Sequence, residues 1–234
     1  MQIRVMEDLL EHNEAMSKAV KERLDDYGIL VLNLMGSPGC GKTSLLEQTV
    51  EALGQELRFA VVEGDLYTAQ DAERIARHGI PTVQINTAGG CHLNAGMIEA
   101  VLGDLPLAKL DILVIENVGN LVCPAEFDIG EDAKVVLLSV TEGEDKPLKY
   151  PLAFRRAAVA ILNKTDLLPH LNFDKTKAVR DIKGINPLAP IIEVSCQTGD
   201  GLTAWYEWLR EQVRRKQVRS KGGNGEVGRN EDRD

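Results

Sequence analysis

An α/β fold, with a mostly parallel sheet and helices on both of its faces, is predicted by three features of the sequence. Short, almost wholly apolar runs, such as residues 29–35 and 112–115, are typical of strands buried on both faces. Between such runs the apolar residues recur at helical spacing, so strands and helices alternate. The first run leads directly into residues 36–43, which read GSPGCGKT. This string between a strand and a helix predicts the three-layer sandwich of P-loop NTPases.

The elements follow in order along the chain. A first helix is expected over Val5–Tyr27, where apolar residues recur at helical spacing, with Gly28 as its C-terminal cap. The strands are expected at 29–35, 58–65, 82–86, 111–119, 135–140, 158–162 and 191–194. Helices are expected from the P-loop to Leu53, over 68–78, up to about Gly103, around 152–156 and around 202–209.

Three parts of the chain are predicted from this pattern. Residues 1–28 form an N-terminal helical extension, and 29–217 form one P-loop domain, as expected for 234 residues with 44% hydrophobic content. Residues 218–234 have few apolar side chains and are expected to be a disordered tail.

Composition excludes several classes of partner. The net charge of −9 argues against a nucleic-acid partner, which would favour a basic face. No apolar run approaches the roughly 18–20 residues of a membrane span, and the start of the chain lacks a signal-peptide core. We therefore expect no membrane association and a cytoplasmic location, where the four cysteines are poor candidates for disulfides.

The P-loop is predicted to bind the phosphates of a nucleotide. Its residues are Gly36, Ser37, Pro38, Gly39, Cys40, Gly41, Lys42, Thr43 and Ser44. The glycines let successive N–H groups face phosphate oxygens, and the following helix adds its positive dipole end. Lys42 is expected to reach the β- and γ-phosphates, and the Thr43 hydroxyl to bind Mg²⁺. The Cys40 side chain is expected to point away from the phosphates.

A second motif predicts that the base is guanine. The string Asn163-Lys164-Thr165-Asp166 directly follows a predicted strand. The Asp166 carboxylate can accept two hydrogen bonds from guanine, whereas adenine presents an acceptor at N1 and would be mismatched. Asn163 is expected to support the P-loop, and Lys164 to lie along the base. Residues Ser195, Cys196 and Gln197 follow the last strand, where a backbone N–H can meet guanine O6.

Two carboxylates are predicted near the γ-phosphate. Asp65 and Glu116 end strands that are expected to neighbour the P-loop strand, so either can help Thr43 hold Mg²⁺ or orient the attacking water. With Lys42 they form the predicted catalytic set. Asp65 alone could instead be a helix cap or a loop acid. Asp71 is a third candidate, or a solvated residue on a first helical turn.

Two thiols and an imidazole form a candidate metal site. Cys91 and His92 stand at the start of a predicted helix, and Cys123 comes four residues after Gly119. Such soft S and N ligands suit Zn²⁺ or Ni²⁺. The spacing is not that of a zinc finger, and packing is the alternative. Because both segments leave the carboxyl ends of strands beside the nucleotide, bound metal would share loops with the γ-phosphate sensor.

From about Met6 to Leu209 the chain resembles the HypB family of hydrogenase nickel-incorporation GTPases, in the SIMIBI class of P-loop proteins. The resemblance rests on the strings Gly36–Thr43, Glu63–Asp65, Gly90–Leu93, Glu116–Pro124 and Asn163–Asp166. The similar urease-maturation GTPases are expected to carry a Cys-Pro-His string, which this chain lacks.

The resemblance implies a GTP-hydrolysing metallochaperone of the cytoplasm that helps deliver nickel to the large subunit of [NiFe]-hydrogenase. It implies a zinc-binding, HypA-like accessory partner and a GTP-dependent homodimer. Cys91, His92 and Cys123 match the metal ligands of the family. The chain has no cysteine before Cys40 and four histidines in all, so its metal site is expected within the nucleotide domain.

Two functions from different classes fit these residues. One is a GTPase switch whose hydrolysis gates metal transfer. The other is a metal-dependent, GTP-binding interaction module with negligible turnover. A small-molecule kinase with a P-loop would have no use for Asn163–Asp166.

Overall fold

The structure is a computed structural model that describes residues 3–66 and 69–223. The strands are β1 (Leu30–Gly36), β2 (Phe59–Asp65), β3 (Thr82–Asn86), β4 (Ile112–Glu116), β5 (Ala133–Ser139), β6 (Ala157–Asn163) and β7 (Ile191–Glu193). The helices are α1 (Ile3–Asp26), α2 (Lys42–Leu53), α3 (Gln70–Ala76), α4 (Ala95–Val101), α5 (Cys123–Glu126), α6 (Lys146–Lys149), α7 (Pro151–Arg156), α8 (Lys175–Ile185) and α9 (Leu202–Gly223). Short 3₁₀ turns span Leu102–Asp104, Leu107–Lys109 and Thr165–His170.

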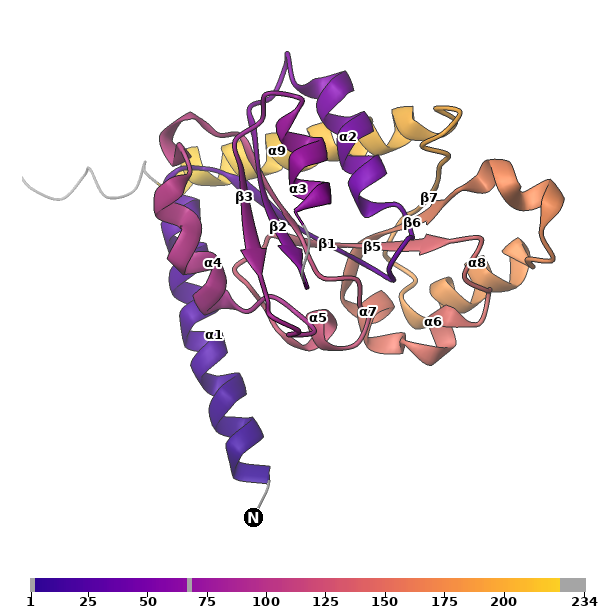
Figure 1. Ribbon diagram of the computed structural model, residues 1–234, viewed down its shortest axis with the longest axis horizontal. Helices are drawn as coiled ribbons and strands as arrows, with labels where there is room; N and C mark the ends of the chain where they lie inside the picture. The colour runs from indigo at the N-terminus through magenta and orange to yellow at the C-terminus, as the bar shows by residue number, and fades with distance from the viewer. Residues whose placement is uncertain (1–2, 67–68, 224–234) are drawn as a thin grey trace, which may run out of the picture.

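The described strands form one seven-stranded sheet in the order β3-β2-β4-β1-β5-β6-β7. Every neighbouring pair is parallel. Helices α2, α3 and α9 cover one face, while α1, α4, α5, α7 and α8 lie on the other (Figure 1). The predicted three-layer α/β fold is therefore confirmed.

Strand β1 shows why the central strands are apolar on both faces. Leu32 and Leu34 pack under α2 and α9, whereas the alternate residues Val31 and Met35 pack under the helices of the opposite face. A strand with a helical layer on each side needs apolar side chains at successive positions, which produces the unbroken apolar run.

Helix α1 is docked by its C-terminal half and extends away from the sheet at its N-terminal end (Figure 1). Val20 and Leu24 are fully buried in a cluster that includes Ile98 of α4. Arg23 of α1 forms an ion pair with Glu99 of α4, with 2.5 Å between Nη1 and Oε1. The predicted N-terminal helix is thus present and packs mainly on α4.

The predicted start of a disordered tail at residue 218 is wrong, because α9 continues to Gly223. Two side chains, Lys216 and Ser220, hold its last turns in place. Lys216 donates to Asp132 at 2.7 Å and also pairs with Asp25, and Ser220 lies against Gly28. Arginine, lysine and glutamine also favour helix. Residues 224–234, the rest of the predicted tail, lie outside the described residues.

Two other expectations differ from the structure. Helix α8 was not predicted, because its two buried side chains, Ala178 and Ile182, are too few to produce an apolar stripe. Strand β2 does not neighbour the P-loop strand β1, because β4 lies between them. Within the described ranges, no helix is both long enough and apolar enough to span a bilayer.

Replacing Leu24 by alanine tests the docking of α1. The side chain is fully buried, so we expect the Leu24→Ala change to lower the free energy of unfolding by about 2–5 kcal/mol. Glu14→Ala is the control on the same helix, because Glu14 is exposed and should change the free energy of unfolding by less than about 0.5 kcal/mol. Urea denaturation measures both. Equal effects would show that α1 is not anchored by its buried face.

Candidate functional site

The P-loop connects β1 to α2 at the carboxyl edge of the sheet. Gly41 caps α2 in a left-handed conformation, with φ of 98°. A Cβ atom at this position would stand 2.3 Å from Nδ2 of Asn163, so the loop requires glycine here. The conformation leaves Lys42 as the first residue of α2, and its side chain is buried, with 8% exposure.

The Asn163–Asp166 segment supports this loop through side-chain hydrogen bonds. Asn163 Nδ2 donates to the carbonyl of Cys40 at 2.9 Å, and Lys164 Nζ donates to the carbonyl of Gly39 at 2.7 Å. The Asp166 carboxylate is fixed by Ser195, whose hydroxyl donates to it at 2.6 Å. The structure thus brings together the two segments that the sequence analysis assigned to phosphate and base.

Two adjoining cavities make up the candidate nucleotide site. One, of about 350 Å³, lies against the P-loop and the ends of β2 and β4. The other, of about 340 Å³, is lined by the predicted base residues Asn163, Lys164, Asp166, Cys196 and Gln197. Both are lined by Gly41, Ser44 and Lys164, so they form one continuous cleft of a size usual for small ligands. Ser195 stands behind this lining, where it holds Asp166.

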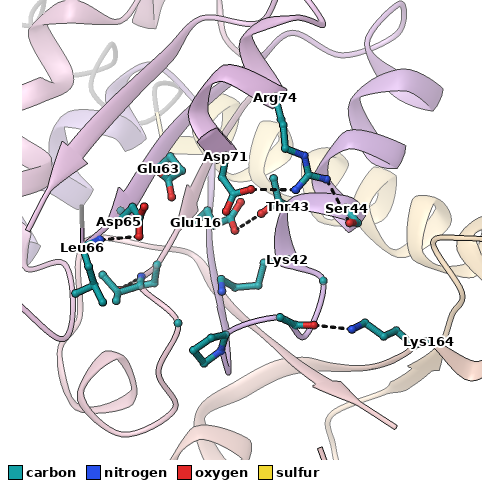
Figure 2. A pocket seen from close by; sticks show the side chains of 17 residues that line it. Lys42, Thr43, Ser44, Glu63, Asp65, Leu66, Asp71, Arg74, Glu116 and Lys164 are labelled. Carbon is teal, nitrogen blue, oxygen red and sulfur yellow. Dashed lines mark hydrogen bonds and ion pairs between the residues drawn. The ribbon is translucent and has the colours of Figure 1, made fainter. Parts of the chain in front are cut away.

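Four carboxylates meet at the phosphate end of the cleft, with Lys42 below them (Figure 2). They belong to Glu63, Asp65, Asp71 and Glu116. The Thr43 hydroxyl donates to Glu116 Oε1 at 2.8 Å. Glu116 ends β4 beside the P-loop strand, as predicted. Asp65 ends β2, which is separated from β1 by β4, so the prediction that its strand neighbours β1 is wrong. Asp65 still lines the same cavity, because parallel strands end at the same edge of the sheet.

Burial raises the proton affinity of two of these groups. It raises the pKa of Glu63 to about 8, with help from the charges of Glu116 and Asp65. It raises the pKa of Glu116 to about 7, against the opposing charge of Lys42. Among the described residues, the Oε2 atoms of both side chains are buried without a hydrogen-bond partner. Unpaired carboxylate oxygens beside a hydroxyl fit a hard cation such as Mg²⁺.

Glu63 and Arg74 line the phosphate cavity but were not predicted as site residues. Glu63 could have been found, because strand alternation places it on the same side of β2 as Asp65. Arg74 carries no such signal in the sequence. On α3 it donates to Asp71 at 2.9 Å and to Glu47 of α2 at 2.5 Å, and it therefore orients Asp71 toward the cavity (Figure 2).

The predicted metal-ligating residues form a compact cluster on two loops. The ligand atoms of Cys91, His92 and Cys123 all lie within 4.8 Å of one another. Cys91 Sγ is 3.0 Å from Cys123 Sγ and 3.5 Å from His92 Nδ1. The His92 ring stacks on Phe127, with 4.1 Å between ring centroids. Two thiols and an imidazole at these distances can share one soft metal ion.

Two pKa shifts act on the cluster in opposite senses, because one favours the metal-binding form of His92 and the other disfavours the metal-binding thiolate of Cys123. Burial lowers the pKa of His92, against the opposing charge of Glu126, which favours the neutral, metal-binding form of the ring. The hydrogen bond with Cys91 raises the pKa of Cys123. For the other two cysteines burial is the main cause, and it raises the pKa of Cys40 and of Cys196 to about 11. Cys40 is fully buried in the core, as expected for a side chain that points away from phosphate.

Hydrogen bonds join the cluster to the phosphate end of the cleft. The Asn117 side-chain carbonyl accepts from the N–H of Leu93 at 3.1 Å and from that of Val118 at 3.0 Å. Asn120 Nδ2 donates to the carbonyl of Cys91 at 3.0 Å. Gly119 packs against Pro38 so closely that a Cβ atom would stand 2.8 Å from the proline ring. One loop therefore contacts both the P-loop and the thiol-bearing segment.

Known proteins are similar to this chain in both sequence and fold. A family model described as CobW/HypB/UreG, nucleotide-binding domain, matches residues 30–193. The hydrogenase maturation factor HypB of Azotobacter vinelandii is 49% identical over 210 residues, which cover 90% of this chain and 69% of that protein.

Two crystal structures match at similar levels. That of hydrogenase maturation factor HypB from Archaeoglobus fulgidus has a TM-score of 0.82 and 41% identity, covering 87% of this chain and 100% of that chain. That of HypB from Helicobacter pylori in complex with nickel has a TM-score of 0.82 and 40% identity, covering 87% of this chain and 96% of that chain.

The raised pKa of Glu63 predicts a pH-dependent stability in the protein freed of nucleotide and divalent metal. Between about pH 4.5 and 8 the folded state binds a proton that the unfolded chain releases, so stability falls as pH rises through this window. Glu63→Gln should remove this contribution. The free energy of unfolding of the variant minus that of wild type should therefore be higher at pH 8 than at pH 5, by on the order of 2 kcal/mol. Urea denaturation in EDTA measures it, with the exposed Glu51→Gln as control. The same pH slope in wild type and Glu63→Gln would exclude buried Glu63 as its source.

Proposed function

The chain belongs to the HypB family of hydrogenase maturation factors, and we propose that it is a GTP-hydrolysing metallochaperone that binds Ni²⁺ or Zn²⁺ and assists nickel insertion into a [NiFe]-hydrogenase. One observation carries the proposal. The loop that follows Glu116 packs on the P-loop at Gly119 and supplies the thiol of Cys123 four residues later. A rearrangement of this loop around a γ-phosphate must therefore move a metal ligand.

The nucleotide roles follow from the geometry of the cleft. The P-loop N–H groups bind phosphate oxygens, and Lys42 directs its charge toward them. Asp166 recognises guanine, in an orientation fixed by Ser195. Thr43, Asp65 and Glu116 are the residues that would hold Mg²⁺, which neutralises phosphate charge when bound. Asp65, Asp71 and Glu116 are the candidates for positioning the attacking water.

The metal is the cargo of this protein. Cys91, His92 and Cys123 offer three ligands, so a tetrahedral ion keeps one position open, which suits transfer better than storage. A GTP-dependent homodimer would bring two such sets together. The zinc-binding HypA-like protein and the hydrogenase large subunit are the proposed partners. We place the protein in the cytoplasm, where thiols remain reduced.

Asp166→Asn tests the recognition of guanine. The change removes two charge-assisted hydrogen bonds, each worth about 1.5–3 kcal/mol, so GTP affinity should fall about a hundredfold or more. Xanthosine triphosphate should bind better than GTP, because the amide donates to the extra xanthine carbonyl. Competition binding measures the preference, and Asp104→Asn, at an exposed position outside the cleft, is the control. A retained preference for GTP would contradict the assignment of Asp166.

The main test of the function is the coupling between metal and nucleotide. Ni²⁺ and Zn²⁺ affinities should differ between the GTP- and GDP-bound protein by about 5–150-fold, for a coupling of about 1–3 kcal/mol. Titration calorimetry of wild type and Cys123→Ser with each nucleotide measures this. Identical metal curves for the two proteins would refute the metal site, and identical curves for the two nucleotides would refute the switch.

Single-turnover GTP hydrolysis with and without metal separates a GTPase from a binding module without turnover.

A further inference from the structure

Helix α1 contributes one buried polar side chain to the layer that it covers. Asn13 lies near the middle of α1 and is 8% exposed. Its Nδ2 donates to the carbonyl of Asp128 at 2.8 Å, and its Oδ1 accepts from the N–H of Ala95 at 3.0 Å. Both halves of the amide are therefore satisfied by backbone groups of two separate segments.

These two segments are the ones that carry the thiol–imidazole cluster. Ala95 begins α4, three residues after His92, and its N–H is one of the donors that a helix start leaves without an intrahelical partner. Asp128 follows Phe127, whose ring stacks on His92, and stands five residues after Cys123. Asn13 thus bridges the segment that carries Cys91 and His92 and the segment that carries Cys123.

We propose that Asn13 is a positioning residue for the metal site, through which α1 holds the two ligand-bearing segments at the spacing that a shared ion requires. This inference rests on the proposed function of Cys91, His92 and Cys123. The hydrogen bonds of Asn117 and Asn120 fix the same segments on the side that faces the nucleotide. Asn13 fixes the same segments farther along the chain, at Ala95 and Asp128, so both the loop after Glu116 and the N-terminal helix hold the cluster.

The docking of α1 supports the bridge mechanically. Leu24 and Val20 bury the helix beside α4, and Arg23 pairs with Glu99, so the helix keeps a constant position relative to the start of α4. Removing the Asn13 amide leaves the buried N–H of Ala95 and the carbonyl of Asp128 without their partner, and both loops can then relax independently. The separation of the Cys91 and Cys123 sulfur atoms should increase or become variable.

The first experiment measures Ni²⁺ affinity and the thiolate-to-nickel charge-transfer absorbance of wild type, Asn13→Ala and Asn13→Asp. We expect Asn13→Ala to bind Ni²⁺ about tenfold more weakly, with a changed charge-transfer band, as for residues that orient metal ligands. Asn13→Asp keeps the acceptor for Ala95 but loses the donor to Asp128, and should fall between the two. Unchanged affinity and spectrum in Asn13→Ala would overturn the proposal.

Asn186→Ala is the matched control for general destabilisation. Asn186 also bridges backbone groups, with its Nδ2 within 3.1 Å of the carbonyls of Phe154, Arg155 and Ala157, but it lies between α8 and β6. It should cost comparable unfolding free energy in the metal-free protein and leave Ni²⁺ binding unchanged. Equal weakening of Ni²⁺ binding in both variants would show that Asn13 acts only through stability.

A metal-free measurement decides the geometry separately. Phenylarsine oxide bridges two thiols that lie close together, so it should capture the Cys91–Cys123 pair in wild type and about tenfold less readily in Asn13→Ala, with Cys91→Ser as the blank. If wild type reacts but binds no nickel, the proposed metal function fails, while the role of Asn13 in spacing the thiols stands. Equal arsenical capture by wild type and Asn13→Ala would remove that role.

Discussion

The burial of Glu63 and Glu116 beside Lys42 is the constraint on which the site depends. A carboxylate buried at the end of a parallel strand, between two layers of helices, is poorly solvated and is stabilised by a proton, a lysine or a cation. In this chain one ammonium group serves two buried carboxyls, and both keep an oxygen without a partner among the described residues. The raised pKa values therefore keep these groups largely protonated near neutral pH, and a divalent cation bound between them would have to displace their protons.

The same strand end connects the two halves of the proposed function. Asn117, the residue after Glu116, is almost fully buried and donates to Asn33 in the middle of β1 at 3.2 Å. Its side-chain carbonyl oxygen accepts hydrogen bonds from the N–H groups of Leu93 and Val118. A single amide therefore links the P-loop strand, the loop at the phosphates and the segment with Cys91 and His92. Coupling between the sites needs no long pathway, because they share this short stretch of backbone.

The sequence predicted the sheet, the P-loop and the thiol–imidazole cluster, because each is encoded by a local pattern: a continuous apolar run, a glycine-rich string, or residues directly after a strand. It did not predict what depends on strand order. Asp65 was assigned to a strand next to the P-loop, but β4 intervenes. Arg74 and Asn13 could not be found, because on a helix an arginine or an asparagine looks the same whether it faces solvent or joins distant segments. Helix α9 extends beyond the last residue of its apolar pattern, because ion pairs of Lys216 hold its last turns.

Strand order also has a consequence for how the chain folds as it leaves the ribosome. Strand β1 is the first strand made, yet its hydrogen-bonded neighbours are β4 and β5, which are encoded roughly 80–100 residues later. The P-loop strand has no partner until residue 112 and beyond have been synthesised, whereas β2 can pair with β3 about 20 residues later and waits only for β4. Such non-local pairing slows folding and leaves apolar strands exposed in the nascent chain. Strand β1, residues 30–36, is therefore the stretch of the nascent polypeptide that chaperones should protect longest.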